Sequence, residues 1–161
     1  ANYTAQYGNQ SNLSLCNGTN ISLPSDISGA TYQWQVDNGS GYTNINEGGI
    51  YTGTTTDTLS LTNIPATMYD YKIRCMVNGN SFSQVYTLKF KTSWTGFSND
   101  VWENPANWSC GALPDSNTDV IISGGSPNYP IINSNKSVRT LTLNTGANLT
   151  VNPGFTLTIL K

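Results

Sequence analysis

Histidine is absent from this chain of 161 residues, and charged side chains make up only 10% of it. Mechanisms that need a histidine base or a histidine metal ligand are therefore excluded within the chain. Seven Lys and Arg stand against nine Asp and Glu, which gives a net charge of -2. Nucleic-acid binding depends on clustered cations that neutralise phosphates. Seven scattered cations exclude that class of partner.

Long apolar runs and a large set of cysteines are also missing. No stretch approaches the roughly 18 consecutive apolar residues of a membrane-spanning helix. Three cysteines leave at least one thiol unpaired or shared with another chain. The chain is rich instead in 21 Thr, 21 Asn and 17 Ser, with 11% aromatic residues. Threonine and aromatic side chains suit pleated, half-buried strands and argue against disorder. The composition predicts an all-β fold.

Short alternating runs that end in turn residues fill the first part of the chain, residues 1–92. The clearest runs are 12–16, 31–36, 58–62 and 71–77. The last of them stops at an Asn-Gly-Asn turn, which is the best short-range hairpin signal in the chain. About seven short strands separated by turns predict a β-sandwich domain over residues 1–92.

This domain resembles the immunoglobulin-like modules repeated in large secreted proteins of the Bacteroidetes. The resemblance rests on residues 32–36 (Tyr-Gln-Trp-Gln-Val), 49–53 (Gly-Ile-Tyr-Thr-Gly), 58–63 (Thr-Leu-Ser-Leu-Thr-Asn) and 68–75 (Met-Tyr-Asp-Tyr-Lys-Ile-Arg-Cys). It implies an immunoglobulin-like sandwich in which Trp34 has a structural role, packed near the cysteine of the sixth strand, Cys75.

The sequence departs from the antibody-type pattern at two positions. Leu23 stands where the second-strand cysteine would be, and Ile73 replaces the usual corner tyrosine. The inter-sheet disulfide of that family is therefore impossible here. Cys75 is left to pair with Cys16, to pair with another partner, or to stay buried and reduced. We expect a structural Cys16–Cys75 disulfide, because the early strand could fold over the edge of the sandwich.

The remaining residues, 93–161, have a different texture and end in a short repeat. Leu-Thr-aliphatic triplets recur at a spacing of eight, with two glycines in the same register: 141–143, 149–151, 157–159, Gly146 and Gly154. Each unit fits one strand and one corner, so 16 to 24 residues would complete a coil. The spacing predicts a short β-solenoid or β-roll, either whole or truncated. An antiparallel meander or a second sandwich is the alternative.

This second block also resembles a module of Bacteroidetes outer-surface and secreted proteins that occurs beside immunoglobulin-like repeats. The resemblance rests on 94–96 (Trp-Thr-Gly), Trp102, 107–109 (Asn-Trp-Ser), Pro114, 119–122 (Asp-Val-Ile-Ile) and the closing Leu-Thr repeats. That family implies a setting outside the cell and no single activity.

A dense aromatic cluster offers the main candidate for a binding site. Trp94, Trp102 and Trp108, with Tyr129 nearby, could stack sugar rings if their faces were exposed. The alternative is a tryptophan plug that caps the open end of the repeat, where apolar surface and strand edges must be covered. The plug is the favoured interpretation.

Metal binding and catalysis have weaker support. Asp115 and Asp119 bracket a loop of oxygen ligands, but calcium needs six to eight oxygens and turn chemistry explains the same composition. No cofactor motif and no nucleophile–base pair are evident, so we expect a protein that is not an enzyme. The cations Lys72 and Arg74, with Lys89 and Lys91 on the next strand, are interpreted as protection of a sheet edge.

Together these patterns predict a non-catalytic structural, adhesion or spacer module of a larger secreted or cell-surface bacterial protein. Its expected partners are neighbouring domains, with a polysaccharide or cell-surface glycan as a further candidate. One alternative is a carbohydrate-binding accessory module of a polysaccharide-degrading enzyme. The other is a fragment of an enzyme whose catalytic domain lies outside these residues.

Overall fold

A computed structural model describes residues 10–161, which divide into two units. Residues 10–14 and 18–89 form the first unit, and Leu15–Asn17 with Phe90–Lys161 form the second. The break near residue 90 falls inside one strand, β9 (Val85–Trp94), and not after it. A strand of ten residues can pair with different neighbours along its length. The strand can therefore continue through residues 92–93, where the composition of the sequence changes.

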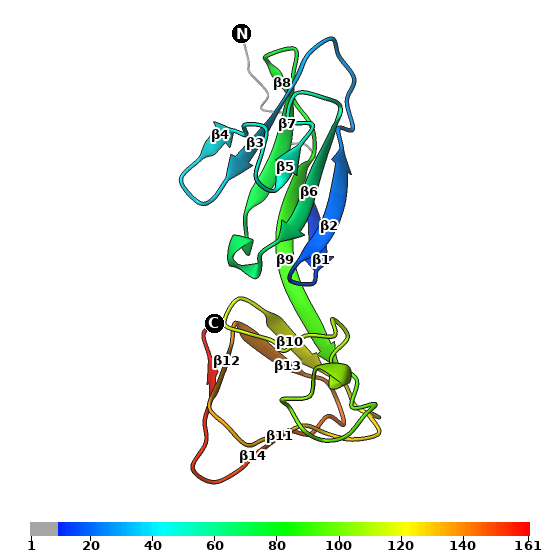
Figure 1. The fold of residues 1–161 in the computed structure, drawn as a ribbon, viewed down its shortest axis with the longest axis vertical. Coiled ribbons are helices and arrows are strands. Elements are labelled where there is room, and N and C mark those ends of the chain that lie inside the picture. Colours follow the sequence, from blue (N-terminus) through cyan, green and yellow to red (C-terminus); the bar gives the residue numbers. More distant parts are fainter. Residues whose placement is uncertain (1–9) are drawn as a thin grey trace. The chain divides into compact units, whose positions relative to one another are not determined.

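The first unit consists of two sheets. One has the order β1, β9, β7, β3, β4, with β8 beside β7, and the other has the order β2, β6, β5. In Figure 1 the β2–β6–β5 sheet lies in front of the β3–β7–β9 sheet. The bounds are β1 (Gln10–Leu15), β2 (Thr19–Pro24), β3 (Tyr32–Asp37), β4 (Tyr42–Asn44), β5 (Tyr51–Thr52), β6 (Thr58–Ile64), β7 (Lys72–Val77) and β8 (Ser81–Phe82), with a 3-10 turn η1 at Ala66–Met68.

Alternation along the strands explains the core of the first unit. In β7 the side chains of Ile73, Cys75 and Val77 are buried, whereas the residues between them are exposed or half-buried. Successive residues of a strand point to opposite faces, so this pattern sets one face of the sheet against the other sheet. Trp34 of β3 is fully buried and lies directly opposite Cys75 in the register. Two sheets around a shared apolar core are consistent with a β-sandwich.

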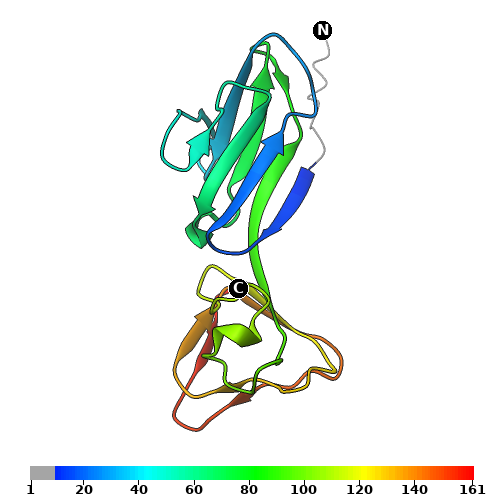
Figure 2. The same cartoon turned by 45° about the vertical axis from the view of Figure 1, so that its right-hand side comes forward.

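The second unit is built from parallel strand pairs. β10 (Asp119–Ile122) pairs with β13 (Thr140–Leu143), β11 (Ile131–Ile132) with β14 (Thr150–Val151), and β12 (Lys136–Val138) with β15 (Leu157–Ile159). Each strand therefore pairs with one that starts 19 to 21 residues further along the chain. We call β10, β11 and β12 the first layer, and β13, β14 and β15 the second layer. Figure 2 shows the chain of this unit running around a roughly three-sided outline.

The eight-residue repeat marks successive sides of the second layer. Its three Leu-Thr-aliphatic triplets fall on β13, β14 and β15, and each of these strands pairs with a strand of the first layer and not with its neighbour in sequence. Antiparallel hairpins between neighbouring repeats are therefore not what connects them. The corners include Gly146 and Gly154, whose φ values of 79° and 89° are left-handed, a conformation that glycine adopts without strain.

The preceding segment lies on the other side of the first layer. β10 has the end of β9 on one edge and β13 on the other, all parallel. Ile131 likewise forms a parallel bridge with Val101 on the side away from β14. A 3-10 turn, η2 (Pro105–Asn107), follows this bridge. Among residues 10–161, no helix is long and apolar enough to cross a membrane.

Candidate functional site

The three tryptophans of the second unit lie in its core. Trp94, Trp102 and Trp108 are 3%, 0% and 3% exposed, and they pack with four aliphatic side chains of the first layer: Val120, Ile122, Ile132 and Val138. The ring of Trp108 is in the middle. Its centroid is 5.0 Å from that of Trp94 and 4.6 Å from that of Trp102, with interplanar angles of 81° and 74°. Edge-to-face packing of this kind is favourable in a core.

This burial argues against the candidate site in which the three rings stack on sugars. A stacking platform needs an exposed ring face, and none of the three tryptophans offers one. The indole nitrogens of Trp94 and Trp108 donate to the backbone oxygens of Asn128 and Trp102, at 2.7 Å and 2.9 Å. We call these three rings the tryptophan plug. The indole nitrogen of Trp102 is buried and has no hydrogen-bond partner in the described part of the chain.

Tyr129 also has a structural position. It is half-buried against the same core. Its hydroxyl donates to the backbone oxygen of Gly146 and accepts from the backbone nitrogen of Gly125, both at 2.8 Å. The hydroxyl thus joins the corner after β10 to the corner after β13. A ring held at both corners by its polar end is placed for packing and not for stacking on a ligand.

Asn107 is the residue that sequence reasoning passed over. Its side chain is fully buried, and its amide makes four hydrogen bonds. The oxygen accepts from the backbone nitrogens of Ser98 and Asn99, and the nitrogen donates to the Asn99 side chain and the Val101 backbone oxygen, over distances of 2.8–3.1 Å. A buried amide with every donor and acceptor used fixes the loop that carries the tryptophan plug. The Asn-Trp-Ser motif was the signal, but nothing in it indicated burial.

The disulfide is Cys16–Cys110, so the prediction of a Cys16–Cys75 pair is wrong. Cys16 belongs to Leu15–Asn17, the short segment that is part of the second unit, and Cys110 follows the last tryptophan of the plug. Cys75 instead points into the core of the first unit and is free. Burial raises the pKa of the Cys75 thiol, against the lowering effect of hydrogen bonds. A buried thiol that stays protonated at neutral pH is not a nucleophile.

The two aspartates considered for calcium are engaged in local hydrogen bonds. Asp115 accepts from the backbone nitrogen of Asn117 at 2.9 Å and the hydroxyl of Thr118 at 2.8 Å, which is a turn stabilised by its own side chain. Asp119 accepts from the hydroxyl of Thr140 at 2.8 Å, across the β10–β13 pair. Within residues 10–161, no group of three or more acidic, cysteine or histidine side chains gathers in a way that could hold a metal ion.

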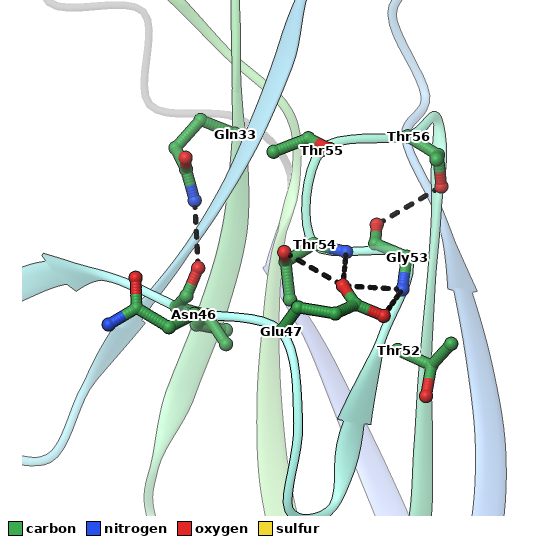
Figure 3. Close-up of a pocket in the computed structure, with 9 residues that line it drawn as sticks. Gln33, Asn46, Glu47, Thr52, Gly53, Thr54, Thr55 and Thr56 are labelled. Carbon is green, nitrogen blue, oxygen red and sulfur yellow. Dashed lines mark hydrogen bonds between the residues drawn. The ribbon is translucent and has the colours of Figure 1, made fainter.

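A solvent-exposed hollow of the first unit was not anticipated from the sequence. It measures about 630 Å³ and is open to solvent. Figure 3 shows the polar residues that line it, from β3 and from the loops on either side of β5. Nine residues line it: Gln33, Ile45, Asn46, Glu47, Thr52, Gly53, Thr54, Thr55 and Thr56.

Glu47 organises one wall of this hollow. Its carboxylate accepts hydrogen bonds from the backbone nitrogens of Gly53 and Thr54 and from the Thr54 hydroxyl, at 3.0–3.1 Å (Figure 3). The backbone hydrogen bonds from Thr54 and Gly53 lower the pKa of Glu47. Gly53 has a φ of +81°, and a Cβ there would lie 2.5 Å from the backbone oxygen of Thr58, so only glycine fits this turn.

The geometry of this hollow suits the binding of a polar molecule by hydrogen bonds better than it suits catalysis. A carboxylate that already accepts four hydrogen bonds is stabilised as the anion and is a poor proton acceptor or metal ligand. Asn46, Thr52 and Thr55 are exposed at the rim and carry amide or hydroxyl groups. The hollow can therefore hydrogen-bond a polar molecule such as a saccharide. It has no aromatic side chain in its lining.

The cations of β7 do not protect an edge, which corrects that interpretation. β7 lies between β3 and β9 in the sheet, so Lys72 and Arg74 are on an interior strand. The guanidinium carbon of Arg74 is 3.7 Å from the ring centroids of both Tyr42 and Phe82. The guanidinium thus lies over both rings. The stack covers the outer face of the sheet with cation–π contacts.

Comparison with known proteins reaches only the second unit. A family described as a domain of unknown function (DUF8693) matches residues 93–161. The matched segment contains the tryptophan plug and both layers. A comparison with curated proteins finds no match.

Proposed function

We propose that this chain is a non-catalytic structural module of a larger secreted or cell-surface bacterial protein. In this proposal the first unit is an immunoglobulin-like sandwich and the second is a β-solenoid closed at one end by the tryptophan plug. Such modules space, display or attach neighbouring domains. The proposal rests on the observation that the tryptophan and cysteine side chains of the second unit are buried or bonded and so are not available to a ligand. Trp94, Trp102, Trp108 and Cys110 are committed to the core and to the disulfide.

The disulfide supports a location outside the cytoplasm. Cysteine pairs persist in oxidising compartments and are rare where thiols are kept reduced. Cys16 and Cys110 are bonded although 94 residues separate them in sequence. This agrees with the secreted or surface setting that the resemblance to Bacteroidetes modules implies. Partner domains of a longer chain would then be the first partners of this module.

A replacement experiment tests the structural role. In the full-length protein, residues 1–161 are exchanged for an unrelated rigid module of similar length, and surface display and the activities of the other domains are measured. A spacer predicts that both are retained. If display is retained but attachment to a surface or substrate is lost, the region binds a ligand and the proposal of a purely structural module is wrong.

A second candidate function is glycan binding at the hollow around Glu47. The observation that favours it is the polar lining, which offers exposed hydroxyl and amide groups from Asn46, Thr52 and Thr55. A glycan array followed by affinity electrophoresis would measure binding. Thr52→Ala with Thr55→Ala should abolish any retardation while leaving the fold intact. Thr142→Ala, an exposed threonine of the second unit, is the matched control.

The third alternative, an accessory region of an enzyme, depends on residues outside this chain. A glycosidase or protease domain in the full-length gene would support it. The replacement experiment then separates a spacer from an accessory region. Replacing an accessory region that positions substrate should lower the turnover of an insoluble polymer but not that of a small soluble substrate.

A further inference from the structure

Equivalent positions in the two layers of the second unit differ in exposure. Three inward-facing side chains of the first layer are completely buried: Ile122, Ile132 and Val138. Their register partners in the second layer are 50%, 38% and 48% exposed: Leu143, Val151 and Ile159. Partners in parallel strands point to the same side of their sheet, so both sets face the interior. The inward-facing aliphatic side chains of the second layer are therefore partly exposed to solvent.

The backbone of the second layer is also paired on one side only. Among the described residues, β13, β14 and β15 each have one strand neighbour, which is β10, β11 or β12. Their other edges carry backbone donors and acceptors that can pair with a further strand. We call this surface, the exposed side chains of Leu143, Val151 and Ile159 with the three strand edges, the open face.

The chain after β15 already follows the path of the first layer. The backbone nitrogens of Leu160 and Lys161 donate to the backbone oxygens of Val138 and Arg139, at 3.2 Å and 3.0 Å. In the first layer these two residues lead directly into Thr140, the first residue of β13. A residue joined to Lys161 would therefore come next over Thr140, at the start of the open face.

We propose that the open face is a docking surface for one more coil of the same repeat, joined to the chain after Lys161. The surface continues the layer-on-layer interface already present between β10–β12 and β13–β15. Its occupant is a polypeptide segment of about 20 residues with aliphatic side chains at the positions above Leu143, Val151 and Ile159. The proposal rests on the interpretation of the second unit as a β-solenoid.

Parallel pairing supports a covalently joined coil over a second copy of the chain. A chain that continues for one more coil adds a parallel strand in the same register beside each of β13, β14 and β15. A second copy related by a twofold axis would bring its own edges in antiparallel. The open edges are also short, two to four residues each, so a separate molecule would gain few backbone hydrogen bonds on any one side.

Extension of the chain tests the proposal. A copy of residues 140–161 is appended after Lys161 in the complete chain, and amide hydrogen exchange is compared with that of the original chain. We expect exchange at β13, β14 and β15 to slow by about tenfold or more, because their free edges become paired. The extended protein should remain monomeric. The matched control carries asparagine at the three inward aliphatic positions of the appended copy, and we expect no slowing there.

Two results would overturn the proposal. One is unchanged exchange at β13–β15 in the extended chain while β10–β12 remain protected. That outcome leaves the structural role untouched, because the replacement experiment measures display and not coil addition. The other is a stable dimer of the 161-residue chain that Leu143→Asn dissociates, since the occupant would then be a second copy.

Discussion

The two ends of the second unit bury the same kind of strand in different ways. At one end, the tryptophan plug covers the first layer, and the inward side chains of that layer are fully buried. At the other end, inward side chains in the same register are between 38% and 50% exposed. The inward positions of both layers carry aliphatic side chains of similar size. Burial in a stacked repeat is therefore set by what lies above each layer and not by the residues within it.

The tryptophan plug differs in composition from the strands that it covers. Three large rings pack against the aliphatic side chains of the first layer, and Asn107 satisfies the backbone of the loop that carries them. A terminal cap of this kind removes exposed apolar surface. Nothing comparable covers Leu143, Val151 and Ile159 in the described chain.

The largest expected effect is at the plug. Trp102→Ala removes a fully buried ring and should lower the free energy of unfolding of the second unit by about 4 kcal/mol, from lost burial and the cavity left behind. Denaturant unfolding followed by the fluorescence of the remaining tryptophans would measure it. Phe97→Ala is the control, because that ring is 87% exposed, and its effect should stay within about 0.5 kcal/mol. Equal effects of the two substitutions would refute the assignment of a plug.

Removal of the disulfide should come next. Cys16→Ser with Cys110→Ser releases a loop closed over a sequence separation of 94 residues. It should cost about 3 kcal/mol, which lies within the range that disulfides typically contribute. Unfolding with and without a reductant gives the same comparison in the unmodified protein. Reductant should leave the double variant unchanged, and a further loss of stability there would show that another cysteine is involved.

The two ends can be compared directly through one register pair. Ile122→Ala and Leu143→Ala shorten side chains that lie opposite each other in β10 and β13. The first should cost about 3 kcal/mol and the second below about 1 kcal/mol, because only the first leaves a buried cavity. Hydrogen exchange of the second unit would report both values. Similar costs would mean that the open face is covered in solution.

The smallest expected effect is the contribution of Glu103 to stability at acid pH. Burial alone would raise the pKa of Glu103, but hydrogen bonds from Ser134 and Lys136 outweigh it, so the pKa lies below the ordinary value of 4.5. A lowered pKa in the folded state contributes stability above pH 4.5 that is lost as the pH falls through the folded value. Because the side chain is 30% exposed, we expect below about 1 kcal/mol.

A pH titration of unfolding measures this contribution. Glu103→Gln should remove the loss of stability that sets in as the pH falls below about 4.5, and it should lower stability slightly at pH 7. A matched variant is Asp100→Asn, an exposed carboxylate of the same loop. An identical acid dependence in both variants would show that the Glu103–Lys136 pair, with its nitrogen and oxygen 3.3 Å apart, does not couple to folding.

Strands were the most predictable part of this protein. The runs at 31–36, 58–62 and 71–77 overlap β3, β6 and β7 within one or two residues, because alternation with period two is visible in the sequence itself. The parallel strand pairs of the second unit are displaced by 19 to 21 residues, within the 16 to 24 that the repeat of eight predicts for one coil, and the solenoid itself stays a prediction. Both are local properties, so a short window of sequence contains them.

The candidate site was much less predictable. The hollow around Glu47 joins β3 to two loops, and its lining residues have no common pattern along the chain. The partner of Cys16 is likewise 94 residues away, and all three possible pairings were compatible with the sequence. Long-range pairing depends on where the backbone brings two residues, which no local pattern reports.

By itself, the sequence determined the strands with clear alternation, the glycine corners of the repeat, and that histidine chemistry is excluded. Only the tertiary structure decided that the tryptophans are buried, that Cys110 and not Cys75 bonds Cys16, and that one layer is covered while the other is open. The physical reason is that strand formation follows from the alternation of neighbouring side chains, whereas burial is a property of the surfaces that meet. A tryptophan in an Asn-rich loop has the same local sequence whether its ring faces water or the core.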